Sequence, residues 1–88
     1  MYKDCYSEEI VKKLAKLKKK DNTHYFQVRK KIDSILENPN HSYKFLTYDM
    51  KSLNRVHIGH FVLVFKVDHQ NQTIFFEDYD HHDLIYRD

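Results

Sequence analysis

The chain has 88 residues, of which 41% are hydrophobic and 15% aromatic, so it can form one domain around one small core. A single cysteine, Cys5, excludes an intramolecular disulfide, and no apolar stretch resembles a signal peptide or a membrane span, so we expect a cytoplasmic protein. The net charge of +2 is unevenly spread: residues 1–40 carry ten Lys and Arg against six Asp and Glu, whereas residues 41–88 carry five against seven together with six of the seven histidines.

The first forty residues predict a short strand followed by two amphipathic helices. Alternation over residues 1–6 indicates the strand. Ser7 is a favourable N-cap for a helix that runs to about Lys20, with an apolar stripe on one face and lysines on the other. Thr23 is the expected cap of a second helix, which Pro39 ends. The lysine-rich surface fits an anionic partner, although lysine runs are more often simply solvated.

The hydrophobic pattern after residue 40 changes to a period of two and predicts strands. Residues 53–58 alternate, residues 61–67 are almost wholly apolar as in a central strand covered on both faces, and residues 73–79 are β-branched and aromatic. Residues 43–46 fit a strand or a loop, and residues 80–86 fit a short edge strand or an ordered tail. We therefore expect an α+β fold with a short N-terminal strand, a helical hairpin and a three- to four-stranded, mainly antiparallel twisted sheet.

Two groups of polar side chains in the second half could carry chemistry. Arg55 and His57 share the strand face that points away from the expected core, and His82 and Tyr86 lie near the end of the chain beside His81. An imidazole can donate or accept a proton near neutral pH. Two imidazoles beside cations can cleave RNA, because one takes the proton of a ribose 2′-hydroxyl, the other protonates the leaving 5′-oxygen and the cation stabilises the phosphorane.

The same histidines have two other interpretations. A single histidine on a small sheet is more often a surface or structural residue than a catalytic one. A zinc site is the second alternative, but His81 and His82 are consecutive and would point to opposite faces of a strand, so only one of them could join His57. We therefore expect neither a metal nor another cofactor.

Two stretches of the sequence resemble the RelE/ParE toxin superfamily. Residues 53–68 are similar to its meander, and residues 78–86 are similar to its C-terminal signature, a basic residue four positions before a terminal aromatic. The N-terminal strand and the two helices match the layout of the family as well. The resemblance implies a single RelE-like toxin domain over residues 1–88. It also implies a type II toxin that enters the ribosome, cuts mRNA in the A site without a metal, and is silenced by a cognate RelB-type antitoxin in a heterotetramer.

The resemblance also implies site residues. Arg55 falls on a basic position of the first meander strand, and His57 falls where the YafQ-type branch has histidine. His82 lies where the family has arginine or, in the same branch, histidine, and Tyr86 aligns with the terminal aromatic. These four are the catalytic candidates. Four further residues are candidates for substrate binding: Lys44, Lys51, His60 and His81.

The sequence departs from the family pattern at Val62, where an arginine is common. Charge stabilisation would then rest on Arg55, Lys44 and Lys51, which favours a mechanism based on histidine rather than arginine. Two alternatives stay open: a ParE-type toxin that inhibits DNA gyrase and cuts no RNA, and a catalytically inactive binding domain of the same fold. The paired histidines and Tyr86 argue against the gyrase inhibitor. In the active complex, the basic helices would contact ribosomal RNA.

Overall fold

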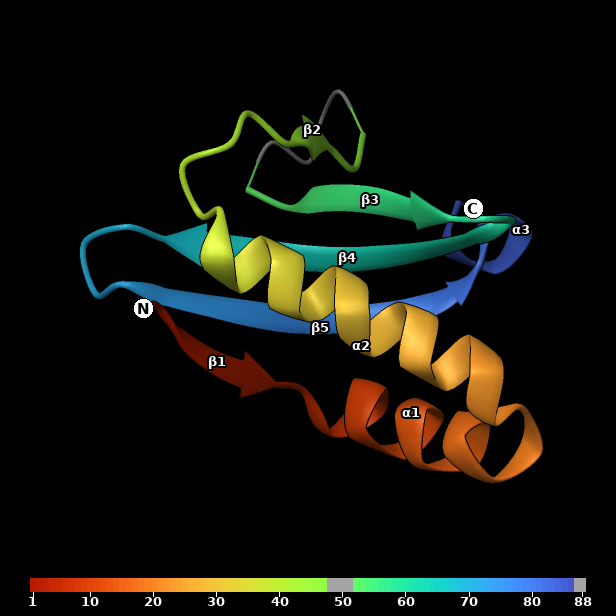
Figure 1. Ribbon diagram of the computed structural model, residues 1–88. Coiled ribbons are helices and arrows are strands. Elements are labelled where there is room, and N and C mark those ends of the chain that lie inside the picture. The colour runs from red at the N-terminus through yellow and green to blue at the C-terminus, as the bar shows by residue number, and fades with distance from the viewer. Residues whose placement is uncertain (48–51, 87–88) are drawn as a thin grey trace.

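The computed structural model of the protein describes residues 1–47 and 52–86, which form a mixed sheet of five strands and three helices (Figure 1). The strands are β1 (Lys3–Tyr6), β2 (Lys44–Phe45), β3 (Asn54–Ile58), β4 (Phe61–Asp68) and β5 (Thr73–His81). The helices are α1 (Glu8–Lys20), α2 (Asn22–Glu37) and α3 (His82–Ile85). Figure 1 shows α2 lying across one face of the sheet and α3 at the end where β5 finishes. None of these helices has the length and apolar character needed to cross a membrane.

The strand order is β1-β5-β4-β3-β2, with β1 parallel to β5 and every other neighbouring pair antiparallel. This confirms the predicted α+β arrangement and its mainly antiparallel sheet. β4 lies at the centre, and consecutive residues such as Val62 and Leu63 are buried on opposite faces, as predicted for a strand covered on both sides. Residues 44–45 form β2, so the strand alternative was the correct one there.

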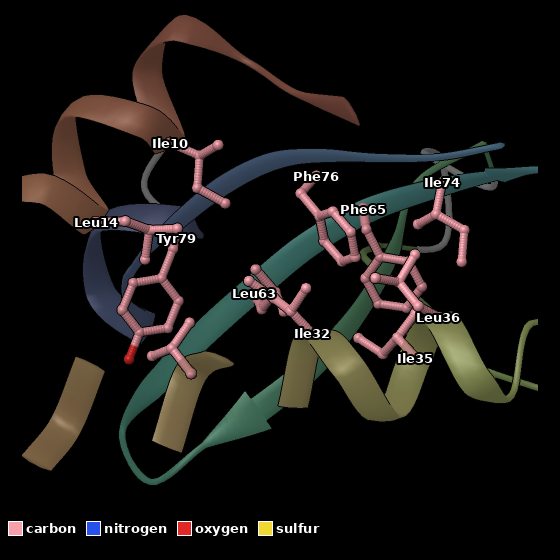
Figure 2. Close-up of a cluster of buried hydrophobic side chains, with 11 residues drawn as sticks. Ile10, Leu14, Ile32, Ile35, Leu36, Leu63, Phe65, Ile74, Phe76 and Tyr79 are labelled. Atoms are coloured by element: carbon pink, nitrogen blue, oxygen red, sulfur yellow. The ribbon is translucent and has the colours of Figure 1, made fainter. Parts of the chain in front are cut away.

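The main core lies between the sheet and the first two helices (Figure 2). Its largest fully buried side chains are Phe65 of β4 and Phe76 of β5. Burying these aromatic rings removes a large apolar area from water, so a short chain can still form an adequate core. The remaining buried members come from both layers: Ile10, Leu14, Val28, Ile32, Ile35, Leu36, Leu63, Ile74 and Tyr79.

Two polar residues begin the long helices. Ser7 caps α1 as predicted, because its Oγ accepts a hydrogen bond from the backbone N–H of Ile10 at 3.1 Å. The cap of α2 is Asp21 and not the expected Thr23, since the Asp21 carboxylate accepts from the backbone N–H of His24 at 3.1 Å. A single residue therefore ends α1 and begins α2, which makes the hairpin tighter than the sequence suggested.

The end of the described chain forms a helical turn, so of the two alternatives for residues 80–86 the ordered tail fits and the edge strand does not. β5 continues to His81, whose Nδ1 accepts from the backbone N–H of Asp83 at 3.2 Å and so caps α3. α3 then brings Ile85 and Tyr86 onto the sheet face opposite α1 and α2. There they join a small apolar cluster that the sequence did not predict, with Leu46, Leu53, Val62 and Val64.

Candidate active site

The sheet face opposite α1 and α2 brings the four catalytic candidates together. His57 of β3 and His82 of α3 stack with ring centroids 6.1 Å apart and an interplanar angle of 26°. The Tyr86 ring lies 4.6 Å from the His82 ring, and Arg55 Nη1 lies 3.3 Å from His57 Nδ1. The two groups that the sequence predicted separately therefore form one cluster.

Local structure explains how each side chain reaches this face. Alternation along β3 places Arg55 and His57 on the same side. His82 and Tyr86 are four residues apart on a helical turn, so their rings lie one above the other. The backbone N–H of His82 donates to the His60 carbonyl at 2.8 Å, which fixes the start of α3 beside the turn between β3 and β4.

A neighbouring strand holds the arginine. Arg55 Nε donates to the Phe45 carbonyl of β2 at 2.9 Å, and Arg55 is half-buried although its strand face points away from the main core. A guanidinium has only donors, so His57 Nδ1 must accept and the proton of the neutral ring lies on Nε2. Lys44 is the cross-strand partner of Arg55, so its side chain extends on the same face.

Positive charge dominates the surroundings of His57. Partial burial, followed by the charges of Arg55, His82 and Lys44, lowers the pKa of His57. The ring is therefore held more in its neutral form than a free histidine. The same concentration of cations favours an anionic ligand at this position.

A carboxylate lies beside the second histidine. Asp83 Oδ1 is 3.6 Å from His82 Nδ1, and Asp83 Oδ2 is 3.7 Å from His81 Nδ1. Asp83 therefore lies close enough to both imidazoles to influence how their rings are oriented.

The other two histidine candidates form a separate pair. The rings of His60 and His81 stack at 6.2 Å, and the edge of His81 meets the Phe61 ring, with centroids 5.5 Å apart. This pair lies at the same end of the sheet but on the helix side. Of the two consecutive histidines, His82 stacks on His57. The two side chains separate because β5 ends at His81 and α3 begins at His82, and not because both lie on one strand.

Two further predicted positions have different outcomes. Val62, which replaces the common family arginine, is fully buried and packs in the small cluster with Ile85 and Tyr86, so this position serves packing. Lys51 lies outside the described residues. Within residues 1–47 and 52–86, no group of three or more His, Cys, Asp or Glu is arranged to hold a metal ion.

Sequence reasoning missed two charged features near the site. His57 also lines an open groove that Lys30 and Lys31 of α2 share. On the same sheet face as the site, Asp78 and Asp80 of β5 bind the ammonium group of Lys13. Both features join residues far apart in the chain, so neither has a signature in local spacing.

Relatives with similar sequences identify the family. No family model matches the sequence. The chain is 43% identical over 88 residues to the candidate toxin RelE4 of Methanocaldococcus jannaschii. The match covers 99% of this chain and 93% of that protein. The chain belongs to the RelE/ParE toxin superfamily. This RelE-family toxin is also 49% identical over 79 residues to an uncharacterised protein of Methanosarcina mazei, covering 89% of this chain and 91% of that protein.

Solved structures give the same assignment for the fold. The toxin superposes on Escherichia coli RelE, crystallised alone and in the RelBE toxin–antitoxin complex, with a TM-score of 0.76 and 21% identity in both cases. The match covers 92% of this chain, and 84% and 96% of the two RelE chains. The RelE-like fold expected from the resemblance is therefore confirmed.

Proposed function

We propose that this RelE-family toxin is a ribosome-dependent, metal-independent endoribonuclease that cuts mRNA in the A site. The observation that carries the proposal is the stacked pair of His57 and His82, 6.1 Å apart, with Arg55 and Tyr86 beside it. Two imidazoles at this separation can flank one phosphodiester and act on its two ends. Cations on the same face supply the charge that a phosphorane requires.

The proposed reaction needs only the RNA strand and these side chains. One imidazole removes the proton of the ribose 2′-hydroxyl while its oxygen attacks the adjacent phosphorus. The other imidazole donates a proton to the 5′-oxygen as the P–O5′ bond breaks, which leaves a cyclic 2′,3′-phosphate and a free 5′-hydroxyl. Arg55, with Lys44 or Lys51, stabilises the developing negative charge. Tyr86 positions the 2′-hydroxyl or stacks on a base.

Arg55 links binding to proton transfer in this mechanism. In the structure, the N–H of Arg55 Nη1 donates a hydrogen bond to the lone pair of His57 Nδ1 at 3.3 Å. A phosphate that draws the guanidinium toward itself frees that lone pair. The arriving negative charge also opposes the surrounding cations and raises the pKa of His57 toward neutrality, where an imidazole is most effective.

The proposal includes the partners of the family. E. coli RelE has been crystallised in a complex with its antitoxin, and we expect this toxin to bind a cognate RelB-type antitoxin in a heterotetramer. The basic helices α1 and α2 would contact ribosomal RNA in the active complex. Because the proposed substrate is mRNA on a translating ribosome, the site of action is the cytoplasm.

The test is cleavage of mRNA on translating ribosomes by the wild type and by His82→Ala. Loss of one acid or base removes a contribution of roughly 10²- to 10⁴-fold, so cleavage should fall by at least about a hundredfold. His41→Ala is the matched control, because His41 is exposed in the loop between α2 and β2 and should leave cleavage unchanged. Circular dichroism checks that both variants fold.

Two results would contradict the proposal. Equal cleavage by the wild type and His82→Ala would remove His82 from the mechanism. A wild-type protein that cuts no mRNA on ribosomes but blocks supercoiling by DNA gyrase would instead support the ParE-type alternative.

A further inference from the structure

His57 lies at the junction of the candidate active site and an open groove. The groove has a volume of about 400 Å³ and is lined by Gln27, Lys30, Lys31, His57 and Ile58. Lys30 and Lys31 lie three and four residues after Gln27, so all three present one side of α2 to the groove. The outer edge of β3 is open at residues 56–58, because β2 pairs only with Asn54 and Arg55 and β4 lies on the opposite side of β3.

The groove is positively charged and is not neutralised from within the described chain. Lys30 and Lys31 are both exposed, and no ion pair joins either of them to an acidic residue among residues 1–47 and 52–86. The nearest acidic neighbour along the helix, Asp33, pairs instead with Arg29 at 3.8 Å. Two lysines that line one groove with an amide and an imidazole form a surface that suits phosphate oxygens.

The position of His57 decides which anion fits. The same ring stacks on His82 on the sheet face and lines the groove, so a chain that follows the groove arrives at the proposed reacting phosphate. A ribosomal RNA helix bound on the outside of α2 would not need to reach His57. The strand that is being cut would have to do so.

Building on the proposed function, we propose that the groove between α2 and the open edge of β3 binds the phosphates of the mRNA strand next to the scissile one, through Lys30 and Lys31. These lysines would then be substrate-positioning residues. They would extend the site from the sheet face around its edge to the helix layer. The cations that lower the pKa of His57 would be partly compensated when this path is filled with phosphate.

The test is a double-mutant cycle in which one change is made in the toxin and the other in the mRNA. Cleavage is measured at saturating and subsaturating toxin on ribosomes programmed with normal mRNA, or with mRNA in which one phosphate next to the cut site is a neutral methylphosphonate. One mRNA carries the modification on the 5′ side and another on the 3′ side. The proteins are the wild type, Lys30→Ala/Lys31→Ala, and the control Lys12→Ala/Lys19→Ala, which removes the same charge from exposed positions on α1 outside the groove.

We expect Lys30→Ala/Lys31→Ala to need roughly tenfold more toxin for half-maximal cleavage of normal mRNA, the combined effect of two exposed ion pairs. With one of the two modified mRNAs, the wild type should also need roughly tenfold more toxin for half-maximal cleavage than with normal mRNA. For Lys30→Ala/Lys31→Ala the same modification should raise the required concentration much less. For the control Lys12→Ala/Lys19→Ala, that modified mRNA should raise the required toxin concentration by the same factor as for the wild type. Equal losses for variant and wild type on both modified mRNAs would overturn the proposal, because the lysines would then contact something else.

The outcomes separate this proposal from the proposed function. If the wild type cuts normal mRNA, and the effects of the lysine substitutions and of the neutral linkages are independent of each other, only the groove assignment fails. If the wild type cuts no mRNA, both proposals fail. If Lys30→Ala/Lys31→Ala cleaves normally but binds the antitoxin more weakly, the groove belongs to that partner and the RNA assignment is wrong.

Discussion

The pairing of Arg55 with His57 determines the chemical state of the candidate site. The arginine is held at its Nε by the Phe45 carbonyl and directs Nη1 to the imidazole. A guanidinium stays charged at any pH at which a protein is folded, so it disfavours a second charge on the adjacent ring. The sequence could predict this neighbourhood from the alternation of a strand, but not the carbonyl of β2 that orients the arginine.

Replacing the arginine should raise the pKa of His57. Partial burial and then the charges of Arg55, His82 and Lys44 lower it in the wild type. In Arg55→Gln one of these positive charges is absent, so the protonated ring is disfavoured less and titrates at higher pH. NMR titration of the imidazole checks the direction, with Lys12→Gln as a control for the loss of one distant charge. An unchanged or lower pKa in Arg55→Gln would contradict the electrostatic role.

At the scale of elements, Ser7 joins the first helix to the sheet. Its Oγ accepts from the Ile10 N–H at 3.1 Å and donates to the Glu77 carbonyl at 2.6 Å. The first contact is a helix cap that the sequence predicts. The second lies at a register shift between β4 and β5, where Val64 pairs with Asp78 and Phe65 with Phe76, and only the folded sheet brings this carbonyl within reach.

Ser7→Ala should therefore lower the stability of the protein more than the loss of an ordinary surface hydroxyl would. We expect the free energy of unfolding to fall by about 1–2 kcal/mol, from a lost cap and a carbonyl left with one partner fewer. Urea denaturation measures the change through the midpoint. Ser34→Ala is the control, because Ser34 is exposed within α2 and should alter stability by less than about 0.5 kcal/mol. Equal effects of the two substitutions would show that the Ser7 contacts contribute little.

At the scale of the whole molecule, one lysine connects the helical layer to the sheet face that carries the site. Lys13 of α1 donates to Asp78 at 2.7 Å and to Asp80 at 2.8 Å around the edge of β5. Although burial alone would raise the pKa of Asp80, the hydrogen bonds from Lys13 and from the backbone N–H of His81 hold it below its usual value. The ion cluster therefore links α1 to the strand that leads into α3.

Lys13→Met should destabilise the toxin in a way that depends on pH. We expect the free energy of unfolding to fall by about 1–2 kcal/mol near pH 7, because the variant loses two charge-assisted hydrogen bonds that are partly solvated in the wild type. Because the folded-state pKa of Asp80 is lowered, this stabilisation is present above the unfolded value and is lost as the pH falls through the folded one. Denaturation of wild type and variant at several pH values checks this, with Lys12→Met as the control. A difference that stays constant down to pH 2 would contradict the assignment.

Local patterns in the sequence determined much of the architecture. Periodicity located the helices and strands, the wholly apolar run identified β4 as the central strand, and alternation predicted the shared face of Arg55 and His57. These features depend on neighbours a few residues apart. The first failure was at a boundary, where Asp21 caps α2 in place of Thr23, because one-residue differences there are decided by hydrogen bonds and packing. For residues 80–86 the sequence left an edge strand and an ordered tail open, and the helical turn α3 was not specified.

Only the tertiary structure decided which distant groups meet. His82 stacks on His57 because α3 turns back over the small apolar cluster, and Lys30 and Lys31 share a groove with His57 because α2 packs beside the uncovered edge of β3. The energy behind both arrangements is the burial of apolar side chains elsewhere in the chain, summed over many contacts. The spacing of residues along the chain does not predict that total burial. The sequence alone therefore determined the parts of this toxin, and the packing of its core determined the site that they form.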